Sequence, residues 1–150
     1  MSDIRLRLMI DLLPGIRSTA SALAAERTRL DVIGQNIANL NTTRGLDGGP
    51  YRRQQVVFES VLDDRIGRPD NLPLQSIRVS QIQKDLRPPK MVYEPGHPDA
   101  NAQGMVAMPD INLYEEMVDL IAASRSFEAN LAVMKSARTL AMQELAIGRR

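Results

Sequence analysis

The sequence predicts a mainly α protein whose long N- and C-terminal helices pack as a coiled-coil-like pair, with a small β or extended middle segment between them. Near both ends, apolar residues recur at alternating steps of four and three, the period of a helix with one apolar seam. Glycines and prolines interrupt the region between the ends. Aromatic residues are only 3% of the 150 residues and eight residues are Met, which suits helix seams better than a bulky core. We therefore expect three segments, residues 1–43, 44–109 and 110–150.

The N-terminal segment, residues 1–43, is expected to be helical, with a break or kink at Pro14-Gly15 because proline removes a backbone hydrogen bond inside a helix. The Asn and Thr side chains of residues 39–43 compete for backbone hydrogen bonds and predict the end of the helix. The seam positions of this helix are Ile16, Ala20, Leu23, Arg27, Leu30, Gly34 and Ile37, with Ile33 and Leu40 beside them.

The middle segment, residues 44–109, is expected to be irregular with a few short strands. Residues 55–58 (Gln-Val-Val-Phe) have strand composition, and residues 74–83 alternate between apolar and polar side chains, with Ile82 out of phase at a bulge or strand end. Residues 62–73 are polar and predict a loop, whereas residues 104–108 predict one more short strand. The proline-rich stretches around residues 87–89 and 94–98 fit no regular element.

The C-terminal segment, residues 110–150, is expected to be one long helix. Asn112 can cap its first turn, with Glu115 three residues later as a capping-box partner, and Gly148 is a plausible stop. The seam positions of this helix are Leu113, Met117, Leu120, Ser124, Phe127, Leu131, Met134, Arg138, Ala141 and Leu145.

The C-terminal helix also has apolar residues beside its seam. Together with the seam they make a stripe wider than one partner helix can cover. Each buried Leu or Met contributes on the order of 1.5–3 kcal/mol, so we expect neighbouring molecules to cover this surface. The simpler alternative is ordinary helix packing within one chain. The residues beside the seam are Val118, Ile121, Val133, Ala137 and Leu140.

Candidate chemistry is sparse, so we expect no enzyme activity, no catalytic residue, no cofactor and no metal. His97, the single histidine, lies between two prolines and is better explained by turn geometry. The glycines of residues 45–49 lack the lysine of a phosphate-binding loop, and the chain has no Cys. A net charge of +1 gives no basic surplus for nucleic acid, although Arg52-Arg53 could pair with acidic groups. We interpret the Glu115-Glu116 pair as favourable negative charge at a helix N-terminus.

Several motifs resemble the family of bacterial flagellar rod and hook axial proteins. Residues 21–30 and 36–43 (Asn-Ile-Ala-Asn-Leu-Asn-Thr-Thr) are similar to the N-terminal helix and signature of that family. Residues 48–54 (Gly-Gly-Pro-Tyr-Arg-Arg-Gln), 93–100 (Tyr-Glu-Pro-Gly-His-Pro-Asp-Ala), 115–118 and 123–130 narrow the resemblance to its proximal rod proteins. The start of the chain through Pro14 and residues 62–73 depart from the family pattern, and Phe127 stands where Tyr is common.

The resemblance implies a structural subunit of the proximal rod of the flagellar basal body. Such a subunit is exported by the flagellar export apparatus without a cleaved signal peptide. It polymerises through its terminal helices with other copies of itself and neighbouring rod proteins. The resulting rod crosses the periplasmic space and transmits torque from motor to hook. The implied partners include no nucleic acid and no small-molecule substrate.

The residues expected at the assembly interface come from both seams and from the signature after the first helix. Two alternatives stay open, another flagellar axial component of the rod or hook, and a soluble helical adaptor whose seams pair within a closed oligomer. The expected interface residues are Leu23, Leu30, Ile33, Ile37, Asn39, Thr42, Met117, Leu120, Phe127, Leu131, Met134 and Leu145.

Overall fold

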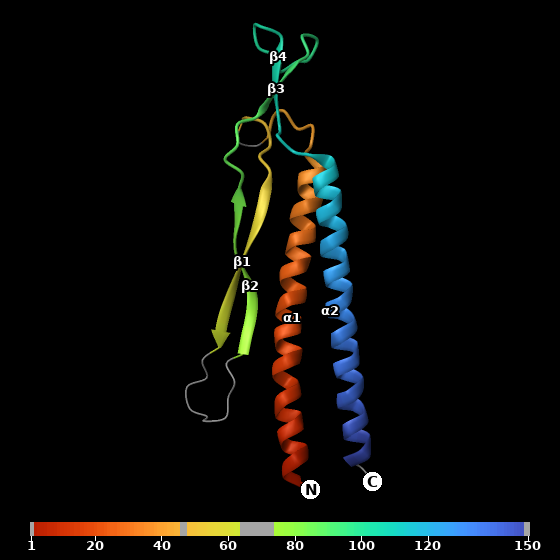
Figure 1. The fold of residues 1–150 in the computed structure, drawn as a ribbon. Coiled ribbons are helices and arrows are strands. Elements are labelled where there is room, and N and C mark those ends of the chain that lie inside the picture. Colours follow the sequence, from red (N-terminus) through yellow and green to blue (C-terminus); the bar gives the residue numbers. More distant parts are fainter. Residues whose placement is uncertain (1, 46–47, 64–73, 149–150) are drawn as a thin grey trace. The chain divides into compact units, whose positions relative to one another are not determined.

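In the residues that it describes, the structure, a computed structural model, contains two long helices separated by four strands (Figure 1). It describes residues 2–45, 48–63 and 74–148. The predicted pair of terminal helices with a small β region between them is confirmed. The elements in order are α1 (Ser2–Ala38), β1 (Gln54–Asp63), β2 (Leu74–Lys84), β3 (Lys90–Tyr93), β4 (Met105–Met108) and α2 (Leu113–Gly148).

Contacts divide the chain into two compact units, and each helix contributes to both. Unit 1 comprises Met1–Arg27, Phe58–Ser80 and Ser124–Arg150, and unit 2 comprises Thr28–Val57 and Gln81–Ala123. No helix in the described part of the chain combines the length and the apolarity needed to span a bilayer.

Helix α1 is a single helix of 37 residues that continues through Pro14 and Gly15, so a break there is wrong, whereas a kink at Pro14-Gly15 stays a prediction. An internal proline costs about 3 kcal/mol, and the Leu, Ala and Arg residues on either side favour helix strongly enough to offset this. The predicted end is confirmed. After Ala38 the chain turns, with the Asn39 amide donating to the Gln35 carbonyl (3.0 Å) and the Thr42 amide to the Asn39 carbonyl (3.1 Å).

Helix α2 begins as its capping residues predict. The Asn112 side-chain oxygen accepts a hydrogen bond from the Tyr114 amide (3.0 Å), which satisfies one of the free donors of the first turn. The Asn112 side-chain nitrogen donates to a Glu115 carboxylate oxygen (3.3 Å), so the two residues do pair, through their side chains. The helix runs to Gly148, the predicted stop.

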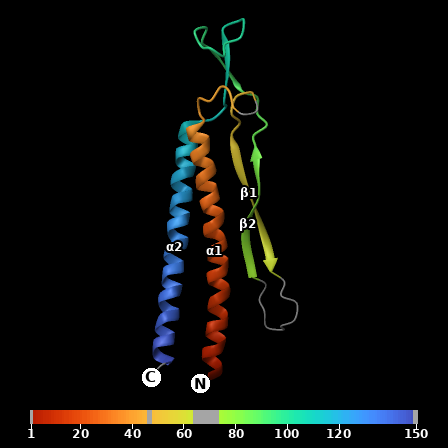
Figure 2. The ribbon, with the colours of Figure 1, turned by 180° about the vertical axis from the view of Figure 1, so that it is seen from behind.

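The strands form two separate two-stranded sheets, β1 with β2 (Figure 2) and β3 with β4. The strand predictions for β1, β2 and β4 are confirmed. β2 continues two residues past the out-of-phase Ile82, to Lys84, so a strand end at Ile82 is wrong. Of the loop predicted for residues 62–73, residues 62 and 63 belong to β1 and residues 64–73 lie outside the described residues. β3, between the proline-rich stretches, was not predicted.

The hairpin of β3 and β4 is antiparallel, from Lys90 opposite Met108 to Tyr93 opposite Met105. Gly104 enters β4 with a φ of 75°, a conformation that favours glycine. A Cβ there would lie 2.9 Å from Tyr93 Cε2 and 3.2 Å from Pro95 Cβ. The turn into β4 therefore depends on a residue without a side chain.

The hydrophobic core is small and lies mainly in unit 2. Among the described side chains, Val32, Ile33, Val106 and Ala123 are buried in unit 2, and Ala25 in unit 1. Two polar residues, Asn36 and Glu116, are as deeply buried as these, at 1% and 0% exposure. The position of these two polar residues defines the candidate site.

Candidate functional site

Asn36, on the last turns of α1, uses its whole amide group in hydrogen bonds. Its side-chain oxygen accepts from the Gln54 amide (2.9 Å) and from the Tyr51 hydroxyl (3.0 Å). Its side-chain nitrogen donates to the Gln54 carbonyl (2.9 Å) and to Glu116 Oε2 (3.0 Å). These four bonds match the two donors and two acceptor sites of an asparagine amide. Asn36 therefore joins α1, the start of β1 and the first turns of α2.

Glu116, fully buried on α2, carries the negative charge of this network. Its Oε1 accepts from Arg53 Nε at 2.5 Å, and Arg53 also contacts Asp119 Oδ2 at 3.5 Å through Nη2. Arg29 on α1 reaches the other oxygen of Asp119 at 3.9 Å. A buried carboxylate is stable only when it is paired and hydrogen-bonded, and Glu116 has both kinds of partner.

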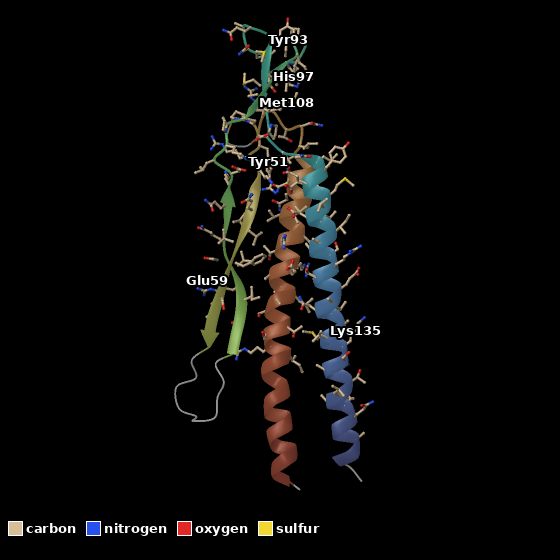
Figure 3. The ribbon with its side chains drawn as sticks, in the orientation of Figure 1. Tyr51, Glu59, Tyr93, His97, Met108 and Lys135 are labelled. Atoms are coloured by element: carbon tan, nitrogen blue, oxygen red, sulfur yellow. The ribbon has the colours of Figure 1, made fainter. Side chains whose placement is uncertain are left out.

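Tyr51 closes the network on the side of the chain that leads into β1 (Figure 3). Burial raises the pKa of the Tyr51 hydroxyl above its ordinary value of 10.0, and the nearby Glu116 carboxylate adds to this effect. The hydroxyl is therefore protonated at neutral pH, as its donation to Asn36 requires.

The loop between β3 and β4 is tied to the segment that follows α1. Thr43 Oγ1 donates to Asp99 Oδ2 (2.8 Å), and Arg44 Nη1 lies 3.8 Å from Asp99 Oδ1. Within the loop, His97 Nδ1 accepts from the Asp99 amide (3.1 Å), which is the turn role predicted for this histidine. Two of the motifs behind the family resemblance are thus in contact, at a separation of 56 residues.

The predicted seam of α2 is partly displaced. Leu120, Phe127, Leu131 and Met134 are half-buried, as the pattern predicts. Leu113 and Met117 are exposed in the single chain, at 37% and 48%, so their burial against a neighbouring chain stays a prediction. The inner face of unit 2 instead follows Glu116 and Ala123, because Glu116 must reach Asn36 and Arg53. The side chain of Leu145 lies outside the described residues.

The predicted seam of α1 is displaced in the same way. Leu23, Leu30 and Ile37 are half-buried, but Ala20, Arg27 and Gly34 are exposed. The most buried side chains are Ala25, Val32, Ile33 and Asn36, which repeat at steps of about seven and four. Ile33, expected beside the seam, is therefore among the most buried side chains of the helix. Asn39 and Thr42 are half-buried and bonded to each other at 3.1 Å.

Helix α2 leaves large apolar side chains uncovered. In its unit 2 part, Tyr114, Val118 and Ile121 follow one another at steps of four and three, with Met117 beside them, and we call these four residues the apolar patch. Val118 and Ile121 are 66% and 53% exposed. Further along the helix, Val133 and Leu140 are 56% and 52% exposed, whereas Ala137 is half-buried. Of the five apolar residues predicted beside the seam, four are therefore exposed, and Ala137 is the exception.

Sequence reasoning did not identify the buried network. It anticipated an acidic partner for Arg52-Arg53, and this is confirmed for Arg53. It interpreted the Glu115-Glu116 pair as favourable charge at a helix N-terminus, and both residues do lie in the first turn of α2, but it did not anticipate that the Glu116 side chain is fully buried. The available signal was the coincidence of a signature Asn, an Arg pair and a Glu pair within the motifs that resemble the family.

A groove of about 700 Å³ lies beside the network in unit 2, and it is lined by residues 39, 42, 45 and 49–54, by residues 84, 85, 87 and 89, and by Asp110. Arg87, one of the lining residues, pairs with Asp85 (2.8 Å) and Asp110 (3.1 Å). Across the described residues, no three His, Cys, Asp or Glu side chains come together as a metal site would require. The groove presents no arrangement of nucleophile, base and oxyanion donors.

Two long helices with a small shared core and a broad uncovered apolar surface are typical of a structural subunit that assembles with other chains. Comparisons with known proteins agree. Residues 16–44 match the family model "Flagella basal body rod protein", and residues 102–146 match "Flagellar basal body rod FlgEFG protein C-terminal".

Similar relatives cover nearly the whole chain. The flagellar basal-body rod protein FlgC of Borreliella burgdorferi is 42% identical over 147 residues, 91% of this chain and 97% of the relative. FlgC of Salmonella typhimurium is 39% identical over 128 residues (85% and 91%), and FlgC of Bacillus subtilis is 39% identical over 142 residues (87% and 94%). The chain belongs to the FlgC family of flagellar basal-body rod proteins, which confirms the resemblance seen in its motifs.

Proposed function

We propose that this chain is a structural subunit of the rod of the bacterial flagellar basal body, located in the proximal rod and transmitting torque from motor to hook. Membership of the FlgC family supports the rod assignment. The single observation that carries the mechanism is the uncovered apolar surface of α2, with Val118, Ile121, Val133 and Leu140 all more than half exposed. We propose no catalytic role.

The physical reason for assembly is the free energy of covering this surface. Full burial of a Val, Ile or Leu contributes about 1.5–3 kcal/mol, so covering the exposed half of each contributes roughly 1 kcal/mol. Several such contacts per subunit, repeated along a polymer, contribute to the free energy that favours assembly over the free chain. In this proposal other copies of the chain and neighbouring rod proteins provide the covering surfaces.

In the rod, we expect α1 and α2 to pack as a coiled-coil-like pair, with residues 1–43 and 110–150 forming the assembling segments and residues 44–109 the intervening one. The contact residues would combine half-buried seam positions, the buried Ile33 and the exposed Met117 with Asn39 and Thr42 of the turn after α1 and with Leu145, whose side chain lies outside the described residues. Export by the flagellar apparatus without a cleaved signal peptide, and a position in the periplasmic space, complete the proposal. The proposed contact residues are those expected from the sequence: Leu23, Leu30, Ile33, Ile37, Asn39, Thr42, Met117, Leu120, Phe127, Leu131, Met134 and Leu145.

The distribution of buried residues suggests how a free subunit behaves. Among the described side chains, unit 1 buries only Ala25, whereas unit 2 holds the remaining core and the polar network. We expect the helix ends in unit 1 to order when neighbours cover them, as in coupled folding and binding. Circular dichroism of the dilute monomer should show less helix than the assembled protein. Full helix content with one cooperative melting transition would contradict this expectation.

The experiment is complementation of a deletion strain of the native host with Val118→Glu or Ile121→Glu. Both positions are exposed, so the charge is tolerated in the free chain but unpaired and buried in the rod. Each variant should be produced and exported yet fail to restore swimming and complete basal bodies. Ser126→Glu, at an exposed polar position of the same helix, should complement fully. Normal motility of both glutamate variants would overturn the assignment of this surface.

A further inference from the structure

The buried Asn36 is not explained by assembly through apolar surfaces. A buried amide costs about 1–3 kcal/mol for each hydrogen-bonding group left unsatisfied, so an apolar residue would be the simpler choice inside a small core. Asn36 is 1% exposed, and its bonds reach Glu116, 80 residues away. Such a group at one position of a helix pair can specify how the helices align.

The apolar residues around Asn36 define this alignment weakly. Val32, Ile33 and Ala123 are aliphatic side chains without directional bonds, and a helix pair with a seven-residue repeat can slide by one repeat, about 10 Å, and keep apolar groups in contact. After such a shift of α2, the residue facing Asn36 in place of Glu116 would be Ala123 or Pro109. Neither has a side chain that could accept from the Asn36 amide.

The same amide also locates the start of β1. Asn36 donates to the Gln54 carbonyl and accepts from the Gln54 amide, so its side chain bonds both backbone groups of one residue, as a neighbouring strand would. Arg53, the preceding residue, then reaches Glu116 and Asp119 on α2. A displaced strand would break both sets of bonds at once.

We propose that Asn36, together with Glu116, sets the axial alignment of α1 against α2 and of β1 against α1. This role is a property of unit 2 in the single chain and does not depend on the proposed function. The buried charge of Glu116 contributes specificity, because only one alignment gives it both the Asn36 amide and the Arg53 guanidinium.

The test measures the alignment by distance between two spin labels in the full-length chain. The chain has no Cys, so Ala38→Cys and Ala122→Cys can be labelled without background. Both positions are exposed and belong to unit 2. Asn36 and Glu116 lie at the same axial level, and the unit 2 parts of α1 and α2 run in opposite directions from there (Figure 1). Ala38 is two residues beyond Asn36 and Ala122 is six residues beyond Glu116, so the two labelled positions differ by eight residues along the helix axis, about 12 Å. A shift of one repeat changes this offset by about 10 Å, which pulsed electron resonance resolves.

The parent chain should give one narrow distance distribution. Asn36→Leu should give a broadened distribution or a second population displaced by several ångströms, whereas Asn41→Leu, the same change at an exposed Asn, should give the parent distribution. An unchanged single distance in a folded Asn36→Leu chain would overturn the proposal.

A second variant decides the matter if Asn36→Leu does not fold. In Asn36→Leu with Glu116→Leu and Arg53→Met, the buried amide and both members of the buried ion pair are apolar, and replacing a whole buried ion pair in this way is often neutral or stabilising. This chain should retain the helix content of the parent but lose its single distance. Retention of the parent distance, or failure of this triple variant to fold, would contradict a role limited to alignment.

Discussion

Replacement of Arg53 by Met should destabilise unit 2 far more than expected for a residue that lies just before the first residue of β1. The Arg53 side chain is 15% exposed and pairs with Glu116, whose side chain is fully buried. Removal of Arg53 leaves the Glu116 carboxylate with the Asn36 amide as its remaining side-chain partner. Breaking a buried pair by removing one partner costs about 3–5 kcal/mol, because the other charge remains buried.

The assay is urea unfolding of the purified chain, followed by circular dichroism at low and high salt. Arg52→Met is the matched control, since Arg52 is exposed and such substitutions change stability by about 0.5 kcal/mol or less. Arg53→Lys should lie between the two, because one ammonium cannot contact Glu116 and Asp119 with the geometry of a guanidinium. High salt should change the Arg53 effect little, as buried pairs are weakly screened. Equal stabilities of Arg53→Met and Arg52→Met would refute the reasoning.

Two further predictions concern the hairpin loop and the network at alkaline pH. Gly104→Ala should lower stability by about 1–2 kcal/mol, because the positive φ disfavours a side chain and its Cβ would meet Tyr93 and Pro95, whereas Gly96→Ala, with open space around it, should cost less. A thermal melt in which the two alanine variants coincide would exclude this role for Gly104. Because the pKa of Tyr51 is raised in the folded chain, its hydrogen bond contributes to the free energy of unfolding in full below about pH 10, the ordinary pKa of tyrosine. This contribution is lost as the pH rises through the higher pKa of the folded state. Tyr51→Phe should therefore lose less stability than the parent between neutral and strongly alkaline pH, and equal losses would contradict the assignment.

Local signals predicted much of the fold. Asn112 predicted the start of α2 because capping depends on residues only two or three positions away. The β-branched and aromatic composition of residues 55–58, which is also a local property, predicted β1. β3 was missed because its four residues are flanked by prolines and are stabilised by pairing with β4, a non-local contact. The continuity of α1 through Pro14 likewise depends on the helix propensity summed over many residues, and not on the proline alone.

The candidate site was less predictable. The exposed face of Val118 and Ile121 follows from helical periodicity alone and was correctly expected. The burial of Glu116 and Ala123, each one residue before a predicted seam position, could not be read from periodicity, because polar bonds to Asn36 and Arg53 hold Glu116 inside. Sequence periodicity assigns charged residues to the exposed face of a helix. Glu116 is instead fully buried, because Arg53, which is 63 residues away in the sequence, pairs with its carboxylate.

The most direct test of the central claim is the composition of purified basal bodies from the native host. Membranes are extracted with detergent, the insoluble basal bodies are isolated, and this chain and known rod components are quantified by mass spectrometry in the same sample. A rod subunit should be present at a fixed ratio to those components, and basal bodies from the deletion strain should lack a complete rod. If the chain remains in the soluble fraction and complete basal bodies form without it, it is not a rod subunit, and a closed helical adaptor becomes the better account.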